Sequence, residues 1–97
     1  WQPAKLPPGF LLASHSHNDG VDGVYEHMVY SDGLAAVSVY VEQQTAGSEI
    51  KQGFNQLGTN NAFVRRQDGL QITVIGEVPP VTVKSIANEV AIAIASD

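Results

Sequence analysis

The histidines are the residues of this chain best suited to metal chemistry. His15 and His17 are two positions apart, so in an extended segment their imidazoles lie on the same side. With Asp19 or His27 as a further ligand, the pair could approach the geometry of a zinc site. No local spacing fixes that third ligand, however, and histidines surrounded by Ser, Asn and Asp are commonly solvated. We therefore expect no physiological metal and no cofactor.

Nucleophilic catalysis lacks the residues that it needs. Ser31 and Ser38 do not stand in the Gly-x-Ser-x-Gly setting of a nucleophile elbow, and no local pattern places a histidine beside either. The chain has no cysteine, which excludes thiol catalysis, a cysteine-based zinc site and disulfides. The acidic residues are scattered, without a pair spaced for acid–base work. The sequence therefore predicts that the protein is not an enzyme.

Glycines do not form a phosphate-binding loop either. Gly53, Gly58, Gly69 and Gly76 lack the Gly-x-x-x-x-Gly-Lys pattern, and none opens a helix directly after a strand. Turns explain most of them. Gly76 lies within a predicted strand, where glycine is typical of a bulge or of close approach by another backbone.

The single basic pair, Arg65-Arg66, is the best candidate for a binding surface. Phe63 lies two positions before it, and Tyr30 and Tyr40 are further large aromatic residues. Arginine and aromatic side chains are enriched where proteins bind each other. We therefore take all five as a candidate partner-binding site. The alternative is that Phe63 lies in the core and both arginines are solvated at the end of a strand.

Length and charge narrow the function classes. The chain has 97 residues, which is one small domain with one core, and 43% of them are hydrophobic. Its formal net charge of −5 leaves too little basic surface for nucleic acid, so we expect a protein partner. Because the chain begins at Trp1 without an initiating Met, we expect an excised domain.

Alternating apolar residues predict the strands that must position these groups. In the clearest run, Leu34–Glu42, three valines share one face. Tight turns are predicted at Ser31-Asp32-Gly33 and Asp68-Gly69, because Asp and Gly suit hairpins. The predicted strands are Phe10–Ser14, Val24–Tyr30, Leu34–Glu42, Leu57–Gln67 and Leu70–Val78.

The remaining segments are predicted to be irregular or helical. Residues 1–9 carry three prolines and are expected to form an extended segment leading into the domain. A loop or a wide hairpin is expected at His15–Gly23, and a loop at Gln43–Gly53. A helix is expected over Thr82–Ala95, after Pro79-Pro80 ends the preceding strand. Its apolar stripe repeats at the helical period and leaves out Ile92; the stripe consists of Val83, Ile86, Ala87, Val90 and Ile94.

Together these elements predict an α+β fold. We expect an antiparallel, meander-like sheet of four to five strands with one C-terminal helix packed on a face. A small closed barrel is the alternative, but the helix argues against it because its stripe needs a sheet face to bury.

Several sequence blocks, taken together in order, resemble a known family. They span nearly the whole chain, beginning with Trp1: Leu6–Phe10, Glu26–Leu34, Val37–Val41, Gly58–Ala62 with Arg65, and Ile72–Val83 with Ile86-Ala87. In these residues the chain resembles the carboxy-terminal domain of the MucB/RseB proteins, which are periplasmic negative regulators of the extracytoplasmic-stress sigma factor.

The resemblance implies a periplasmic regulatory domain that binds the periplasmic part of a membrane-spanning anti-sigma factor and shields it from proteolysis. It also implies a larger amino-terminal domain, similar to lipoprotein carriers, which these 97 residues do not include. Lipid sensing belongs to that amino-terminal domain and is not expected of this chain. Contact between this chain and the amino-terminal domain is expected. The competing hypothesis is a structural module that forms homo-oligomers through exposed strand edges.

Overall fold

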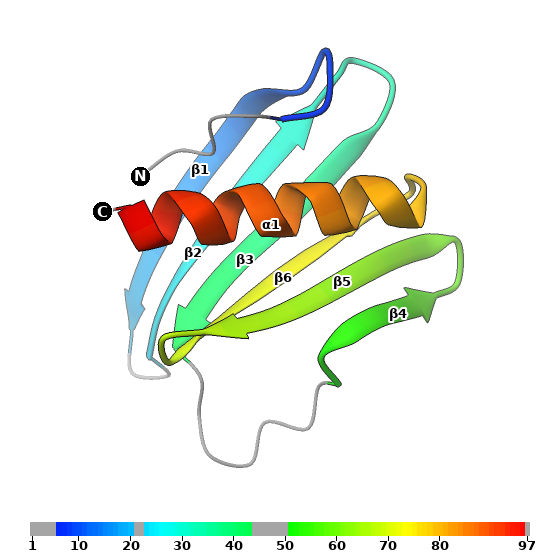
Figure 1. Ribbon diagram of the computed structural model, residues 1–97. Helices are drawn as coiled ribbons and strands as arrows, with labels where there is room; N and C mark the ends of the chain where they lie inside the picture. Colours follow the sequence, from blue (N-terminus) through cyan, green and yellow to red (C-terminus); the bar gives the residue numbers. More distant parts are fainter. Residues whose placement is uncertain (1–5, 21–22, 44–50, 97) are drawn as a thin grey trace.

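A single helix lies across one face of an antiparallel sheet (Figure 1). The computed structural model describes residues 6–20, 23–43 and 51–96. The elements, in chain order, are β1 (Leu11–Gly20), β2 (Gly23–Ser31), β3 (Ala36–Gln43), β4 (Gly53–Leu57), β5 (Asn60–Gln67), β6 (Leu70–Gly76) and α1 (Pro80–Ser96). The predicted α+β class is therefore confirmed. Within these described ranges, no helix has both the length and the apolar character needed to cross a membrane.

The sheet has six strands in the order β1-β2-β3-β6-β5-β4, where four to five were predicted. The strands form two meanders, β1-β2-β3 and β4-β5-β6, which meet where β3 pairs with β6. A continuous meander would pair β3 with β4 instead. The connection after β3 leads to the far edge of the sheet, so the second meander runs back toward the first. This places β3 and β6 at the centre of the sheet.

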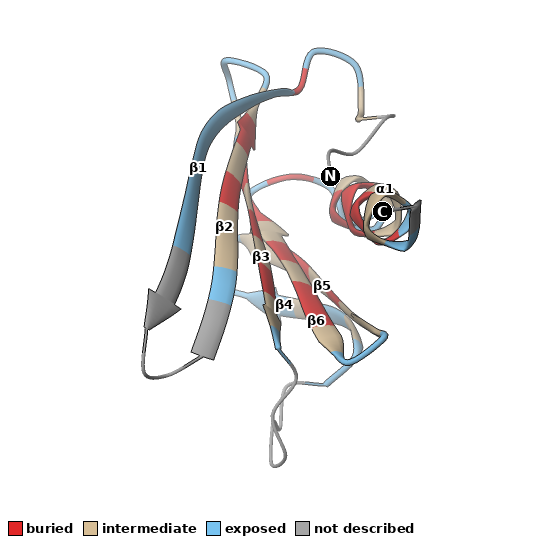
Figure 2. Ribbon diagram, turned by 90° about the vertical axis from the view of Figure 1, so that its left-hand side faces the viewer, coloured by how far each residue is buried: buried red, intermediate tan, exposed pale blue. Residues whose placement is uncertain are grey.

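The core lies between the sheet and α1. Val37, Val39 and Val41 on β3 face the helix, and their cross-strand partners on β6 include Val74 and Ile72. The helix contributes its predicted stripe, of which Val83, Ile86, Ala87 and Val90 are buried and Ile94 packs against the core in part. The core cluster therefore lies between the two layers, and in the described part of the chain the opposite face of the sheet carries no helix (Figure 2).

Two predicted turns are confirmed. Asp32 Oδ1 accepts hydrogen bonds from the backbone N–H groups of Leu34 at 2.9 Å and Ala35 at 2.8 Å. These bonds lower the pKa of the Asp32 carboxyl, the bond to Ala35 most, because they favour its charged form. At the β5–β6 turn, Asp68 has φ 52° and Gly69 has φ 78°, the two positive angles of a primed hairpin turn.

Gly76 is confirmed as a point of close backbone approach. A Cβ atom at Gly76 would lie 2.8 Å from the carbonyl oxygen of Ala36 on β3. Real Cβ atoms do not approach an oxygen so closely, so only glycine fits without a shift of the backbone. The chain then leaves β6 and starts α1 at Pro80, where proline suits the first helical turn.

Of the two alternatives predicted at His15–Gly23, the hairpin agrees with the structure, whereas a loop is wrong because residues 15–20 belong to a strand. β1 continues to Gly20 and pairs with β2 through the register Gly20↔Gly23. The side chains of residues 11–17 are all exposed, so β1 is an edge strand that shows no buried face in its sequence. Backbone pairing with β2, rather than apolar alternation, holds it extended. The two residues between the strands lie outside the described part of the chain.

The sequence did not predict β4. The predicted strand Leu57–Gln67 covers the last residue of β4, a turn and the whole of β5. Leu57 ends β4, a turn follows at Gly58-Thr59, and β5 starts at Asn60. β4 is a short edge strand whose Phe54 and Leu57 are both exposed, so it lacks the period-2 burial that marks a strand. Most of the predicted loop Gln43–Gly53 lies outside the described residues.

Smaller boundaries also differ. Leu34 was predicted to begin a strand but is 98% exposed in the turn before β3, whose first residue is Ala36. In the described part of the leading segment, the Phe10 N–H donates to the carbonyl of Pro7 at 3.1 Å, so the chain turns there and is not extended. Trp1 lies outside the described residues.

The contact between helix and sheet predicts a large loss of stability when the stripe is truncated. Ile86→Ala should lower the free energy of unfolding by about 2–5 kcal/mol, because Ile86 is fully buried. Ile92→Ala is the matched control, because Ile92 is 57% exposed on the outer side of the same helix. It should change the free energy of unfolding by less than about 0.5 kcal/mol. If chemical denaturation showed equal losses for Ile86→Ala and Ile92→Ala, the packing of α1 on the sheet through Ile86 would be contradicted.

The Asp32 turn predicts a pH-dependent contribution to stability. Because the folded state lowers the pKa of Asp32 below its ordinary 3.8, this contribution is present above the unfolded pKa and lost as the pH falls through the folded pKa. The difference in free energy of unfolding between the wild type and Asp32→Ala should therefore shrink on acidification. A difference that is constant down to the lowest pH at which the protein folds would contradict this assignment.

Candidate partner-binding surface

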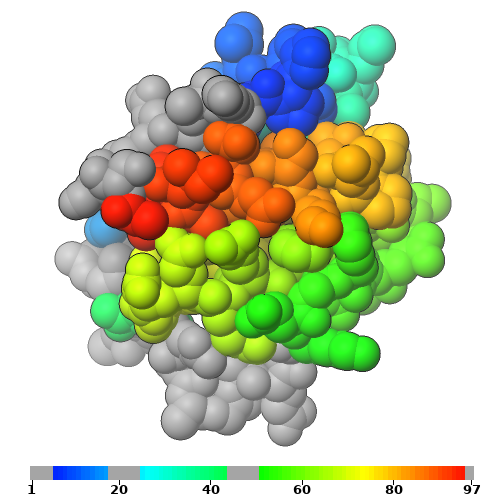
Figure 3. All heavy atoms as spheres, viewed as in Figure 1, coloured from blue at the N-terminus to red at the C-terminus, as the bar shows by residue number. Residues whose placement is uncertain are grey.

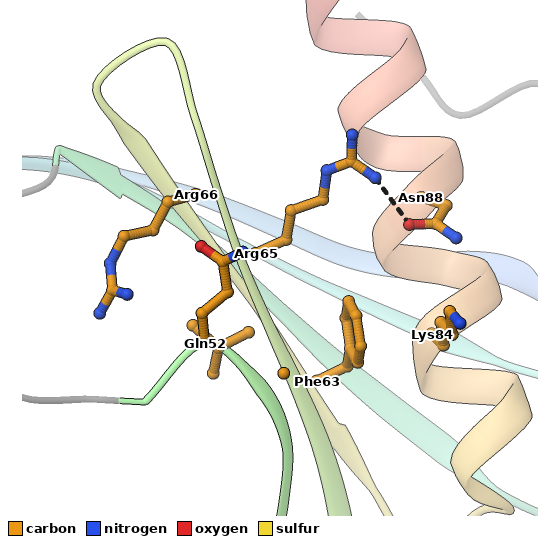
Figure 4. Close-up of a pocket in the computed structure, with 8 residues that line it drawn as sticks. Gln52, Phe63, Arg65, Arg66, Lys84 and Asn88 are labelled. Atoms are coloured by element: carbon orange, nitrogen blue, oxygen red, sulfur yellow. Dashed lines mark hydrogen bonds between the residues drawn. The ribbon is translucent and has the colours of Figure 1, made fainter.

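Phe63 and Arg65 lie on the face of the sheet that carries α1, and Arg66 lies on the opposite face. In the register of β5 with β6, Phe63 is paired with Val74 and Arg65 with Ile72, both of which point to the helix. Neighbouring residues of a strand point to opposite faces, so Arg66 points away from α1. The two arginines therefore diverge from one strand (Figure 4).

Arg65 is held in place by neutral partners on two elements. Its Nη1 donates to Asn88 Oδ1 on α1 at 2.8 Å, and its Nη2 donates to Gln67 Oε1 at 3.3 Å. Gln67 in turn donates through Nε2 to the carbonyl of Ala91 at 2.9 Å. Within the described part of the chain, Arg65 has no carboxylate partner. Its guanidinium is thus oriented by the fold while its charge stays uncompensated.

Two phenylalanines lie beside the arginine. Phe54 on β4 is paired with Phe63 on β5, and their rings meet edge to face with centroids 4.9 Å apart. Phe54 is 52% exposed, so about half of this large apolar side chain is accessible to a partner. Lys84 on α1 places its Nζ 6.0 Å from the centre of the Phe54 ring, within reach of a weak cation–π interaction.

We call Phe54, Phe63, Arg65, Lys84 and Asn88 the basic–aromatic surface. All except Phe54 line a cavity of about 500 Å³ between β5 and α1, which Gln52 and Arg66 also line. The chain has five basic residues, and three of them line this cavity. The space-filling view shows α1 as a continuous band along the segments of β4 and β5 (Figure 3). Positive charge and exposed aromatic surface are therefore concentrated where helix and sheet meet.

The structure does not gather the five predicted residues on one surface. Tyr30 is buried in the core, where its hydroxyl donates to Met28 Sδ at 3.6 Å and burial raises its pKa. Tyr40 lies on the face away from α1 and stacks on His27, with ring centroids 4.3 Å apart. Phe63 and Arg65 lie on the face toward α1 with the buried Tyr30, whereas strand alternation places Arg66 and Tyr40 on the opposite face.

Phe54, Lys84 and Asn88 were not predicted. Lys84 and Asn88 are four residues apart on the helix and therefore lie on one side of it, a spacing that was visible in the sequence. Their approach to Arg65 depends on how α1 crosses the sheet, which no local pattern specifies. Phe54 was assigned to neither a strand nor the site because β4 itself was missed.

The candidate metal ligands do not converge. His15 Nε2 and His17 Nδ1 both lie 3.6 Å from Glu26 Oε1, whereas His27 is on the opposite face of β2 against Tyr40. The side chain of Asp19 lies outside what the structure describes. In the described ranges, no group of three or more His, Cys, Asp or Glu residues could hold a metal ion.

The serines considered for catalysis have structural environments. Ser31 Oγ accepts from the Gly33 N–H at 3.0 Å and donates to the Ala35 carbonyl at 3.0 Å, so it belongs to the β2–β3 turn. Ser38 lies on the sheet face away from α1, opposite Val29 and Ile75. In the register of the described strands, no histidine is directly opposite Ser31 or Ser38.

The fold places this chain among small α+β domains in which one helix crosses an antiparallel sheet. Within that class, the chain belongs to the MucB/RseB C-terminal domain family, whose model matches residues 1–91. The resemblance drawn from the sequence blocks is thereby confirmed.

Curated relatives and solved structures agree with this assignment. The sigma-E factor regulatory protein RseB of Escherichia coli (strain K12) is 37% identical over 93 residues, which cover 93% of this chain and 29% of that protein. The sigma factor AlgU regulatory protein MucB of Pseudomonas aeruginosa is 31% identical over 93 residues, covering 90% of this chain and 29% of that protein. The chain thus spans less than a third of the length of these relatives.

The crystal structure of MucB in complex with MucA(peri) is similar in fold. It aligns with a TM-score of 0.69 at 30% identity, over 90% of this chain and 34% of that one. The crystal structure of MucB gives a TM-score of 0.63 at 31% identity, over 92% of this chain and 31% of that one.

The divergence of the histidines predicts that metal does not stabilise the fold. Because His27 faces away from His15 and His17, treatment with a chelator followed by buffer exchange should leave the melting temperature unchanged. Elemental analysis before treatment should find no stoichiometric metal. A retained metal, lost together with several degrees of melting temperature, would contradict this prediction.

Proposed function

We propose that this domain acts in the periplasm and binds the periplasmic segment of an anti-sigma factor. The observation that carries the proposal is the likeness to MucB in complex with MucA(peri), over 90% of this chain. The names of the curated relatives, which are sigma-factor regulatory proteins, support the same role. The exposed Phe54 and the uncompensated charge of Arg65 provide a surface of the composition typical of protein interfaces.

Binding would shield the anti-sigma segment from proteolysis and thereby restrain the envelope-stress sigma factor. This role is steric and needs no catalytic group. Because the chain spans 29% of its relatives' length, we further propose that it forms one half of a clamp and that the amino-terminal domain of the family is the other half. Lipid sensing is assigned to that other domain.

Of the residues predicted from the sequence, we propose Phe63, Arg65 and Arg66 as the contacts. Phe63 and Arg65 belong to the basic–aromatic surface, and Arg66 lines the same cavity from the other face of β5. Tyr30 is too deeply buried to touch a partner in this fold, and Tyr40 lies on the far face of the sheet. Tyr40 would contribute only if the partner wrapped around the sheet edge.

Calorimetric titration with the partner's periplasmic fragment tests the proposal. Replacing Arg65 and Arg66 together with Ala should weaken binding by about 1–3 kcal/mol, because each arginine can form charge-assisted hydrogen bonds with a carboxylate. The salt dependence of binding should fall as well. In parallel, the fragment should be cut more slowly by an added protease when the wild-type domain is present.

Circular dichroism of the double variant controls for loss of the fold. If the wild-type domain neither binds the fragment nor slows its cleavage, the proposed function is wrong for this domain alone. If it binds but the double variant binds equally well, the arginines are not contacts.

A second candidate is a homo-oligomer formed through a strand edge. β1 is an edge strand of ten residues, and Leu11 and Leu12 on it are 74% and 45% exposed. A dilution series by light scattering, with and without the fragment, distinguishes this homo-oligomer from a domain that binds the anti-sigma segment. A dimer that persists on dilution and is indifferent to the fragment would favour the structural module.

A further inference from the structure

We propose that the basic–aromatic surface recognises a short acidic segment of the partner that also carries an apolar side chain. A carboxylate would lie between Arg65 and Lys84, and the apolar side chain would pack on Phe54. This inference rests on the proposed function and names the chemistry of the segment that the domain takes.

The charge distribution is the first argument. Glutamate and aspartate outnumber basic residues by ten to five over the chain, yet Arg65, Arg66 and Lys84 line one cavity. Within the described part of the chain, neither Arg65 nor Lys84 forms an ion pair. The acidic remainder of the domain repels an anionic segment, so attraction is strongest where Arg65 and Lys84 lie together.

The state of the Arg65 side chain is the second argument. A guanidinium has five N–H donors, and Arg65 uses two of them, on Asn88 and Gln67. Within the described residues the remaining donors have no partner, so they can meet a carboxylate, and the side chain is already ordered, so binding costs little conformational entropy. Because both present acceptors are neutral, a carboxylate adds an attraction that the folded domain lacks.

The aromatic pair is the third argument. Phe54 exposes 52% of its surface, and its ring is fixed by the edge-to-face contact with Phe63. A rigid, exposed ring beside cations is the kind of anchor that dominates binding energy at interfaces. β4 pairs with β5 only from Asn60 to Val64, where Val64 is opposite Gly53, the first residue of β4. Arg65 therefore lies just beyond this paired region, and it is the next residue after Phe63 on the same face of β5. Apolar and charged contacts therefore adjoin.

Matched pairs of substitutions test the inference by titration with the same periplasmic fragment. Lys84→Glu should weaken binding at least about tenfold, whereas Lys51→Glu, the same charge change at an exposed lysine that lines a different groove, should change it by less than about twofold. Phe54→Ala should also weaken binding at least about tenfold. Leu57→Ala is its control on β4, since Leu57 is 61% exposed and points to the opposite face.

Charge exchange identifies the carboxylate. Each acidic residue of the fragment is replaced by lysine in turn, and one such fragment should bind the wild type weakly but regain affinity for Lys84→Glu. If the fragment binds the wild type and all four domain variants with equal affinity, the inference is wrong while the proposed function stands. Equal losses in the test and control variants would likewise overturn it, as would the absence of any charge-exchange rescue. If the wild type does not bind the fragment, the proposed function fails and this inference fails with it.

Discussion

The burial of the α1 stripe against the valines of β3 and β6 is the interaction on which the rest of the structure depends. Val83, Ile86 and Val90 on the helix are fully buried in one core with the apolar residues of β3 and β6. Two features at the end of β6 make this packing possible. Gly76 lets β6 lie close to the backbone of β3, and Pro80 starts the helix soon afterwards.

The same packing assembles the basic–aromatic surface. Asn88 reaches Arg65, and Gln67 reaches the carbonyl of Ala91, only because α1 crosses above β5. Lys84 comes from the same side of the helix, one turn earlier, and approaches Phe54. Stability and recognition are therefore linked, because the helix that closes the core also supplies Lys84 and Asn88 of the proposed binding surface.

The parts of the fold that were predictable are those with a strong local cause. The period-3.6 stripe identified α1, the alternating valines identified β3, and Asp68-Gly69 identified a primed turn. β4 and the second half of β1 were missed because edge strands are held by pairing on one side and bury few side chains. Pairing between distant segments leaves no periodic signal in either one.

The candidate site was predictable only in part for a related reason. Arg65 and Phe63 were found because they are large, typical of interfaces and only two positions apart in the sequence. Alternation within one strand was also readable and separates Arg66 from Arg65. Phe54 and Asn88, however, join the surface through strand order and helix placement, neither of which is local. Tyr30 looked like a surface aromatic but fills the core beside Met28.

Amide hydrogen exchange, measured residue by residue with and without the periplasmic fragment, tests most directly whether the helix–sheet junction is the docking surface. Binding there should slow exchange in β4 and in the first half of α1, and leave β1 unchanged. Slower exchange confined to β1 and β2, with β4 and α1 unaffected, would contradict it.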